Sequence, residues 1–135
     1  MSLRDLHLLT VIVIHRMPAR KHVLFVCASN LWRSPTAEAL YRDHPQLEVR
    51  SAGIRPNARR RIGAGDIKWS DVIFVMEREH KKWIQDHFRD AELPPIEILD
   101  IPDDFGFMDS ELQTLLRLAI DPELEVLFSS DPLEE

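Results

Sequence analysis

Two kinds of hydrophobic pattern alternate along this chain. Short, mostly apolar runs have the length and composition of buried strands, and they lie at HVLFV (22–26), LEVRS (47–51), DVIFVM (71–76) and IEIL (96–99). The segments between and after these runs mix polar and apolar residues and predict helices over 35–44, 58–69, 77–88 and 109–120. Strands that alternate with helices indicate a parallel sheet covered on both faces. The sequence therefore predicts an α/β fold, with three α/β/α layers around a four-stranded parallel sheet.

The predicted elements suggest one domain, residues 21–120, between an N-terminal extension (1–20) and an acidic C-terminal tail (121–135). The extension holds the apolar run LHLLTVIVI at 6–14, which is shorter than the roughly 20 residues that a membrane-spanning helix needs. Asp5 beside Arg4 and the lack of a small-residue cleavage site disfavour a signal peptide. We expect either a natural start at Met17 or an edge strand formed by residues 1–16.

Charge and cysteine content narrow the function classes. The formal net charge of −6 argues against general nucleic-acid binding, which needs a basic face to displace counterions. The single cysteine excludes an internal disulfide framework and fits a reducing compartment. We therefore expect a cytoplasmic protein that binds neither nucleic acid nor a membrane.

The segment VLFVCASNLWRSPT, residues 23–36, carries the clearest chemical signal. A buried strand leads into Cys27, and a short loop then leads to Arg33, Ser34 and Pro35, where a helix can begin. Backbone N–H groups of such a loop, the positive end of the helix dipole and a planar guanidinium all suit a bound phosphate. A cysteine thiolate at the same place is a strong nucleophile. The alternative is that Cys27 is a small buried apolar residue at the end of a strand.

This segment, extended to VLFVCASNLWRSPTAEAL, resembles the phosphate-binding loop of the low-molecular-weight protein tyrosine phosphatases. LEVRSAG (47–53), residues 58–77 and IPDDFGFMDSEL (101–112) resemble later parts of the same family, in the same order. The resemblance implies a Rossmann-like phosphatase fold in which Cys27 attacks phosphorus and forms a phosphocysteine. The residues that it implies for phosphate binding are Ala28, Ser29, Asn30, Leu31, Trp32, Arg33 and Ser34. By the same resemblance Ser51 holds the side chain of Asn30, although a serine at a strand end also commonly bonds its own backbone.

Two aspartates compete for the role of general acid. The family places its acid directly after an Ile-Pro pair, and Ile101-Pro102 is followed by Asp103, which the resemblance therefore implies. Asp104 stands where the family usually has proline, so it remains a second candidate. Asp109 more plausibly caps the last helix.

The chain departs from the family pattern in two places. Only four residues join Ser51-Ala52-Gly53 to Ala58-Arg59, where the family usually has some twenty-odd that form one wall of its cleft, so we expect a more open site. Trp32 occupies a position that often holds a second, protective cysteine. It is either an aromatic wall for substrate or a surface residue at the start of a helix, and Phe105 and Phe107 are the other candidates for a wall.

Two further groups of residues have simpler interpretations. The basic turn, Arg55, Arg59, Arg60 and Arg61, is either a solvated loop or a surface that steers an anion toward the cleft. His80 and His87 lie seven residues apart, too far for the i, i+4 pair of a helical zinc site, and we expect both at the surface. We predict no metal site and no cofactor.

The sequence thus predicts a monomeric, cysteine-dependent and metal-free phosphatase that hydrolyses phosphotyrosine in proteins and aryl phosphates. One alternative is a phosphate or phosphopeptide-binding module without turnover, which the shortened wall and Asp104 motivate. The other is a thiol-coupled arsenate reductase, which the lack of further cysteines disfavours.

Overall fold

The computed structural model describes residues 19–129, so the apolar run at 6–14 lies outside the described residues. Four strands form the sheet: β1 (Lys21–Cys27), β2 (Leu47–Gly53), β3 (Val72–Val75) and β4 (Ile96–Ile98). Four helices accompany them: α2 (Arg33–Tyr41), α3 (Ala64–Trp69), α4 (Arg78–His87) and α5 (Ser110–Ser129). None of these helices is long and apolar enough to cross a membrane.

The sheet is wholly parallel, with the strand order β2-β1-β3-β4. The chain moves outward from β1 to β2 and then crosses back to place β3 on the other side of β1. Crevices form at such a reversal of strand order, outside the carboxyl ends of the strands, and ligands bind there in open α/β sheets. The predicted α/β class and the four-stranded parallel sheet are confirmed.

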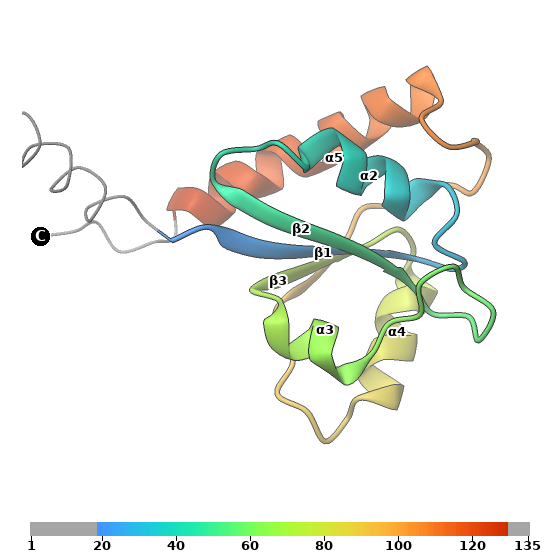
Figure 1. Ribbon diagram of the computed structural model, residues 1–135, viewed down its shortest axis with the longest axis vertical. Coiled ribbons are helices and arrows are strands. Elements are labelled where there is room, and N and C mark those ends of the chain that lie inside the picture. The colour runs from blue at the N-terminus through green and yellow to red at the C-terminus, as the bar shows by residue number, and fades with distance from the viewer. Residues whose placement is uncertain (1–18, 130–135) are drawn as a thin grey trace, which may run out of the picture.

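Side chains of β1 alternate between two hydrophobic cores, one on each face of the sheet. Val23, Phe25 and Cys27 belong to the core beneath α2 and α5, whereas Leu24 and Val26 belong to the core beneath α3 and α4. Figure 1 shows the two pairs of helices on opposite faces. Because β1 is central and packed on both sides, the end of this strand is a rigid place from which to present Cys27.

Two of the predicted helices differ from those in the structure. The helix expected over 58–69 begins only at Ala64, because residues before it pair with β2 through the bridge between Gly53 and Arg61. The last helix, expected to end at Ile120, continues to Ser129 despite Pro122. Pro122 is exposed, so the carbonyl group that it leaves without an intrahelical partner can face water.

The continuation of α5 follows from its apolar spacing. Leu112, Leu116, Ile120 and Leu124 recur every fourth residue, and all four are buried. Residues at this spacing lie on one face of a helix. The first turns of the expected tail therefore contribute a core residue, Leu124, to the fold.

Gly53 at the end of β2 offers a test of how closely the next segments are packed. An added Cβ would lie 2.7 Å from the Ala58 Cβ, 2.8 Å from the Ala28 oxygen and 2.9 Å from the Asn30 nitrogen. We expect Gly53→Ala to lower the free energy of unfolding by about 1–3 kcal/mol, because two of these neighbours are backbone atoms. Urea unfolding would measure the change.

The matched control is Gly65→Ala, where a Cβ would meet nothing within 4 Å. This control should be neutral or slightly stabilising, since alanine is the better helix former. Equal stability of the two variants would show that the contacts at Gly53 are not restrictive.

Candidate active site

The carboxyl ends of three parallel strands meet at the site. Cys27 is the last residue of β1, Glu77 follows β3, and the loop with Ile101 and Asp103 follows β4. Arg33 begins α2 and joins the three segments. The topology therefore assembles side chains that are distant in sequence at the switch point of the sheet.

Cys27 lies against the hydroxyl group of Ser34. The sulfur is buried, and the distance from Cys27 Sγ to Ser34 Oγ is 2.9 Å. Asn30 Nδ2 donates to the same hydroxyl oxygen at 2.9 Å, and the other acceptor near the hydroxyl, the Ala52 carbonyl, is 3.4 Å away. The hydroxyl proton is thus best placed to bond the sulfur, where it would stabilise the negative charge of a thiolate.

Asn30 fixes the shape of the loop. It is fully buried and has a φ of 55°, a left-handed conformation that asparagine tolerates better than most residues. Its amide also donates to Ser51 Oγ at 2.9 Å, and Ser51 in turn donates to Glu38 Oε1 at 2.8 Å. A chain of hydrogen bonds therefore connects α2, β2 and the loop to the cysteine.

The loop backbone is oriented by the basic turn. The carbonyl oxygens of Ala28 and Ser29 accept the backbone N–H groups of Arg55 and Arg59, at 3.0 Å each, and the carbonyl oxygen of Asn30 accepts Arg59 Nε at 3.0 Å. In a trans peptide the next N–H points opposite to the carbonyl group. The N–H groups of residues 29–31 therefore point away from the turn, the direction that an anion cradle requires.

The guanidinium of Arg33 is buried, with 2% of the residue exposed. Its Nη1 donates to Glu77 Oε2 at 2.6 Å and to the Ile101 carbonyl at 2.7 Å. Arg33 Nε lies 3.5 Å from Asp103 Oδ1 and makes no hydrogen bond. The guanidinium is thus held on one side by a carboxylate and keeps donor capacity for an anion.

The two candidate acids differ in their surroundings. Both are exposed, but Asp103 lies within ion-pair distance of Arg33, whereas Asp104 makes no hydrogen bond or ion pair within residues 19–129. Asp109 Oδ1 accepts the backbone N–H of Glu111 at 2.9 Å, as expected of a residue that caps α5.

The arginines of the basic turn have structural partners as well. Arg55 Nη1 donates to Ser29 Oγ at 3.2 Å, and Arg60 donates to the Ser51 carbonyl at 2.7 Å and pairs with Asp66. The side chains of these residues remain partly or largely exposed. The turn is therefore more than a solvated loop, because it braces the phosphate loop and β2.

Sequence reasoning missed Glu77 and His80. The prediction of a surface position for His80 is wrong, since the residue is fully buried, whereas His87 is exposed as expected. His80 Nδ1 accepts the backbone N–H of Glu77 at 3.1 Å and so closes the first turn of α4. Burial, followed by the charge of Arg33, lowers the pKa of His80 to about 4. The signal in the sequence was the Glu-x-x-His spacing directly after a buried strand.

The carboxylates of Glu77 and Glu79 and His80 Nε2 lie within 4.8 Å of one another, a separation that a metal ion can bridge. However, Nδ1 of His80 is the acceptor for Glu77, so the neutral ring carries its proton on Nε2. A metal ligand needs a lone pair at that atom. Glu77 Oε2 is moreover engaged by Arg33. These three side chains therefore suit hydrogen bonding and ion pairing better than metal coordination.

Comparisons with known proteins agree with this geometry. The family model described as "Low molecular weight phosphotyrosine protein phosphatase" matches residues 22–63, which include the loop, Ser51 and the basic turn. The low molecular weight protein-tyrosine-phosphatase Ptp of Acinetobacter johnsonii is 30% identical over 89 residues. The chain is a relative of the low molecular weight phosphotyrosine protein phosphatases. The resemblance seen in the sequence is confirmed.

The alignment with Ptp takes up 48% of this chain and 63% of that relative. The alignment is 89 positions long, but 48% of this chain is only about 65 residues. Roughly 24 positions of the alignment are therefore gaps in this chain. A gap of this size fits the shortening expected between Gly53 and Ala58.

Solved structures show the same fold. The low molecular weight protein tyrosine phosphatase SP-PTP from Streptococcus pyogenes has a TM-score of 0.68 at 19% identity, over 79% of this chain and 93% of that one. The YwlE arginine phosphatase from Geobacillus stearothermophilus has a TM-score of 0.61 at 27% identity, over 83% and 99%.

The buried His80 predicts a pH dependence of stability. Its pKa falls from 6.5 in the unfolded chain to about 4 in the fold, so the unfolded chain binds the proton first as the pH falls. The contribution of neutral His80 to the free energy of unfolding is fully present above about pH 6.5 and is lost as the pH falls toward 4. Below about pH 4 this contribution changes no further. The loss should be on the order of 3 kcal/mol, since each unit of pKa difference corresponds to about 1.4 kcal/mol.

Urea unfolding of wild type beside His80→Gln, at several pH values, would test this. Glutamine can accept the same Glu77 N–H but does not titrate in this range. The stability difference between the two proteins should shrink or reverse as the pH falls. A difference that is constant from pH 7 to pH 4 would contradict the burial argument.

Proposed function

We propose that this chain is a cysteine-dependent, metal-free phosphatase that hydrolyses phosphotyrosine in proteins and simple aryl phosphates. One observation carries the proposal. The Cys27 sulfur lies 2.9 Å from the Ser34 hydroxyl, in a loop that leads directly into the buried guanidinium of Arg33. A nucleophile and hydrogen-bond donors for an anion in one rigid loop are what phosphoryl transfer to sulfur requires.

The first step transfers the phosphoryl group to the protein. The Cys27 thiolate attacks phosphorus, the bond from phosphorus to the phenolic oxygen breaks, and that oxygen takes a proton from the carboxylic acid of Asp103. The loop N–H groups and Arg33 hold the equatorial oxygens, where negative charge is greatest. A phosphocysteine and a free tyrosine side chain result.

The second step regenerates the protein. The Asp103 carboxylate accepts a proton from a water molecule as the water oxygen attacks the phosphocysteine. The bond between sulfur and phosphorus breaks, and inorganic phosphate and the Cys27 thiolate are released. The exposed position of Asp103 near Arg33 supports both proton transfers, because a leaving group and a water molecule can each reach it.

The substrate class rests on the relatives. The Acinetobacter relative is named as a protein-tyrosine-phosphatase, whereas the Geobacillus neighbour is an arginine phosphatase. We favour phosphotyrosine, with a phosphoarginine peptide as the comparison substrate. We further propose that the protein works as a monomer in the cytoplasm, where a single thiol stays reduced.

Each of the two alternative functions predicts a result that differs from that of a phosphatase. A phosphopeptide-binding module would bind phosphotyrosine peptides but release no phosphate. An arsenate reductase would oxidise an external thiol such as glutathione in the presence of arsenate. The presence of the nucleophile, the guanidinium and an acid within one site supports the phosphatase over both.

Three variants test the mechanism: Cys27→Ser, Asp103→Asn and Asp104→Asn. With a phosphotyrosine peptide, Cys27→Ser should abolish turnover, and Asp103→Asn should lower kcat by roughly 10²–10⁴-fold because the phenolate leaves without a proton. Asp104→Asn is the matched control and should retain kcat within about 3-fold. Release of inorganic phosphate would be measured.

p-Nitrophenyl phosphate should be run beside the peptide, since its good leaving group needs less help and should shrink the effect of Asp103→Asn. Full activity of Cys27→Ser would overturn the proposed mechanism. A large loss in Asp104→Asn alone would transfer the role of acid to Asp104. No turnover by freshly reduced wild type would favour the binding module.

A further inference from the structure

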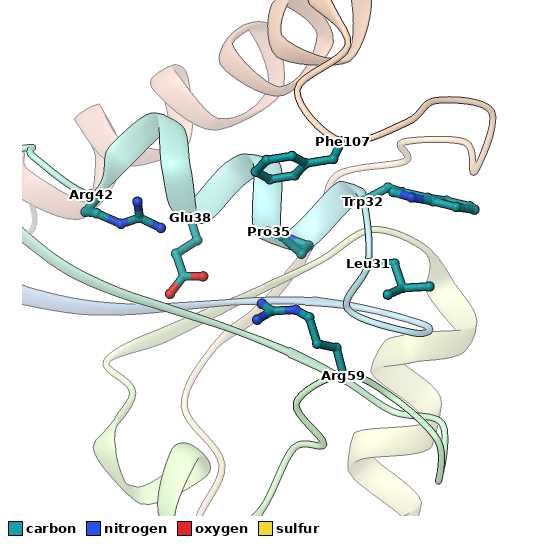
Figure 2. A pocket seen from close by; sticks show the side chains of 7 residues that line it. All are labelled: Leu31, Trp32, Pro35, Glu38, Arg42, Arg59 and Phe107. Atoms are coloured by element: carbon teal, nitrogen blue, oxygen red, sulfur yellow. The ribbon is translucent and has the colours of Figure 1, made fainter.

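A pocket of about 420 Å³ lies beside the phosphate loop. Its walls come from four segments of the chain, and Figure 2 shows the lining residues: Leu31, Trp32, Pro35, Glu38, Arg42, Arg59 and Phe107. Phe107 lies above Pro35, and the guanidinium of Arg59 extends from the opposite side toward Glu38. We call this hollow the flank pocket.

The flank pocket shares two residues with the loop of the proposed catalytic site. Leu31 and Trp32 belong to the loop between Cys27 and Arg33, and Phe107 follows Asp103 by four residues. A polypeptide whose phosphorylated residue lies over Cys27 therefore has a neighbouring segment within reach of the pocket. The short connection between Gly53 and Ala58 contributes no lining residue, and the basic turn contributes only Arg59.

Exposed apolar side chains gather around the flank pocket. Leu31, Trp32 and Phe107 are 47%, 45% and 56% exposed. They make up half of the large exposed apolar residues within 19–129, and the other three are Met108, Leu118 and Val126. Single exposed apolar residues are ordinary, but several around one hollow are typical of an interaction site.

The charge of the pocket is positive in a protein of net charge −6. Arg42 forms no ion pair within the described residues, and Arg59 is anchored to the phosphate loop through its Nε, which leaves its terminal nitrogens facing the pocket. Glu38 is the one acidic lining residue, and Ser51 already donates to its Oε1 at 2.8 Å. Two guanidinium groups thus face a single, partly satisfied carboxylate.

From these observations we propose that the flank pocket binds a segment of the substrate polypeptide beside the phosphorylated residue, one with an acidic side chain next to an apolar one. The acidic side chain pairs with Arg42 and Arg59, and the apolar one packs on Phe107, Pro35 and Leu31. This inference rests on the proposed function. It assigns part of the selectivity to side chains that neither hold phosphate nor move a proton.

The test compares two phosphotyrosine nonapeptides that carry leucine beside the phosphotyrosine and differ only in having Glu or Gln at the remaining flanking positions. Wild type should show a higher kcat/KM for the Glu peptide. Arg42→Glu should lower kcat/KM for the Glu peptide by about 3- to 10-fold and leave the Gln peptide and p-nitrophenyl phosphate unchanged. Arg42 suits the test because it is exposed, lies beyond the end of α2 and has no bond to the phosphate loop.

Arg89→Glu is the matched control, because it changes the net charge equally at an exposed site shortly after α4, a helix on the other face of the sheet. Phe107→Ala tests the apolar part and should weaken the binding of both peptides, and Leu118→Ala, at an exposed position of α5, is its control. Equal losses of kcat/KM for the Glu peptide in Arg42→Glu and Arg89→Glu would mean that the net charge of the protein steers the peptide, and would overturn the proposed role of the pocket. No preference of wild type for the Glu peptide would overturn it too.

Binding separates this inference from the proposed function. Cys27→Ser should bind the Glu peptide more tightly than the Gln peptide, and adding Arg42→Glu should remove the difference. If wild type turns over no phosphoester and the peptides bind with this preference, the proposed catalysis fails and the pocket stands. If turnover is normal and the preference is absent in both assays, the pocket fails alone.

Discussion

The buried positive charge of Arg33 is the constraint on which the rest of the site depends. A guanidinium removed from water is unfavourable by several kcal/mol unless it is paired and hydrogen-bonded. Arg33 meets this requirement with Glu77 after β3 and the Ile101 carbonyl after β4, at 2.6 and 2.7 Å. One side chain at the start of α2 therefore fixes the relative positions of two strand ends and the loop that carries Asp103.

A second network holds the loop from the other side. Asn30 adopts its left-handed conformation in the interior, where its amide bonds Ser34 and Ser51. These neutral hydrogen bonds define the geometry of the cysteine, whereas Arg33 and Glu77 define the charge around it. Gly53 lets the end of β2 pack closely against this loop, because an added Cβ at residue 53 would lie only 2.9 Å from the Asn30 backbone nitrogen. The hydrogen bonds that set the shape of the loop thus involve β2, whereas the contacts that place the charge of Arg33 come from residues after β3 and β4.

The sequence was most informative where function depends on neighbours in the chain. The segment from Cys27 to Ser34 is a local motif, and the alternation of strands and helices gives the sheet on which it sits. Glu77 was missed despite its local Glu-x-x-His spacing, because an acidic residue at the start of a helix has an ordinary explanation in the helix dipole. His80 was misjudged because α4 is highly charged, and only the packing of α4 against the sheet buries this residue together with Ile84. The extent of α5 was missed because Pro122 is a strong breaker locally, yet burial of Leu124 at the fourth-residue spacing outweighs it.

The shortened connection after Gly53 separates two tasks that a longer wall would combine. The groups proposed to hold phosphate lie inside the fold, so phosphate binding should not depend on a longer connection here. Recognition of what surrounds the phosphate does depend on walls, and here the nearest ones are the helix α2, the basic turn and Phe107. Arg55 and Arg59 brace the loop through its carbonyl oxygens, and Arg59 also reaches the flank pocket. The same short turn thus supports the loop and supplies one charged wall of the pocket beside it.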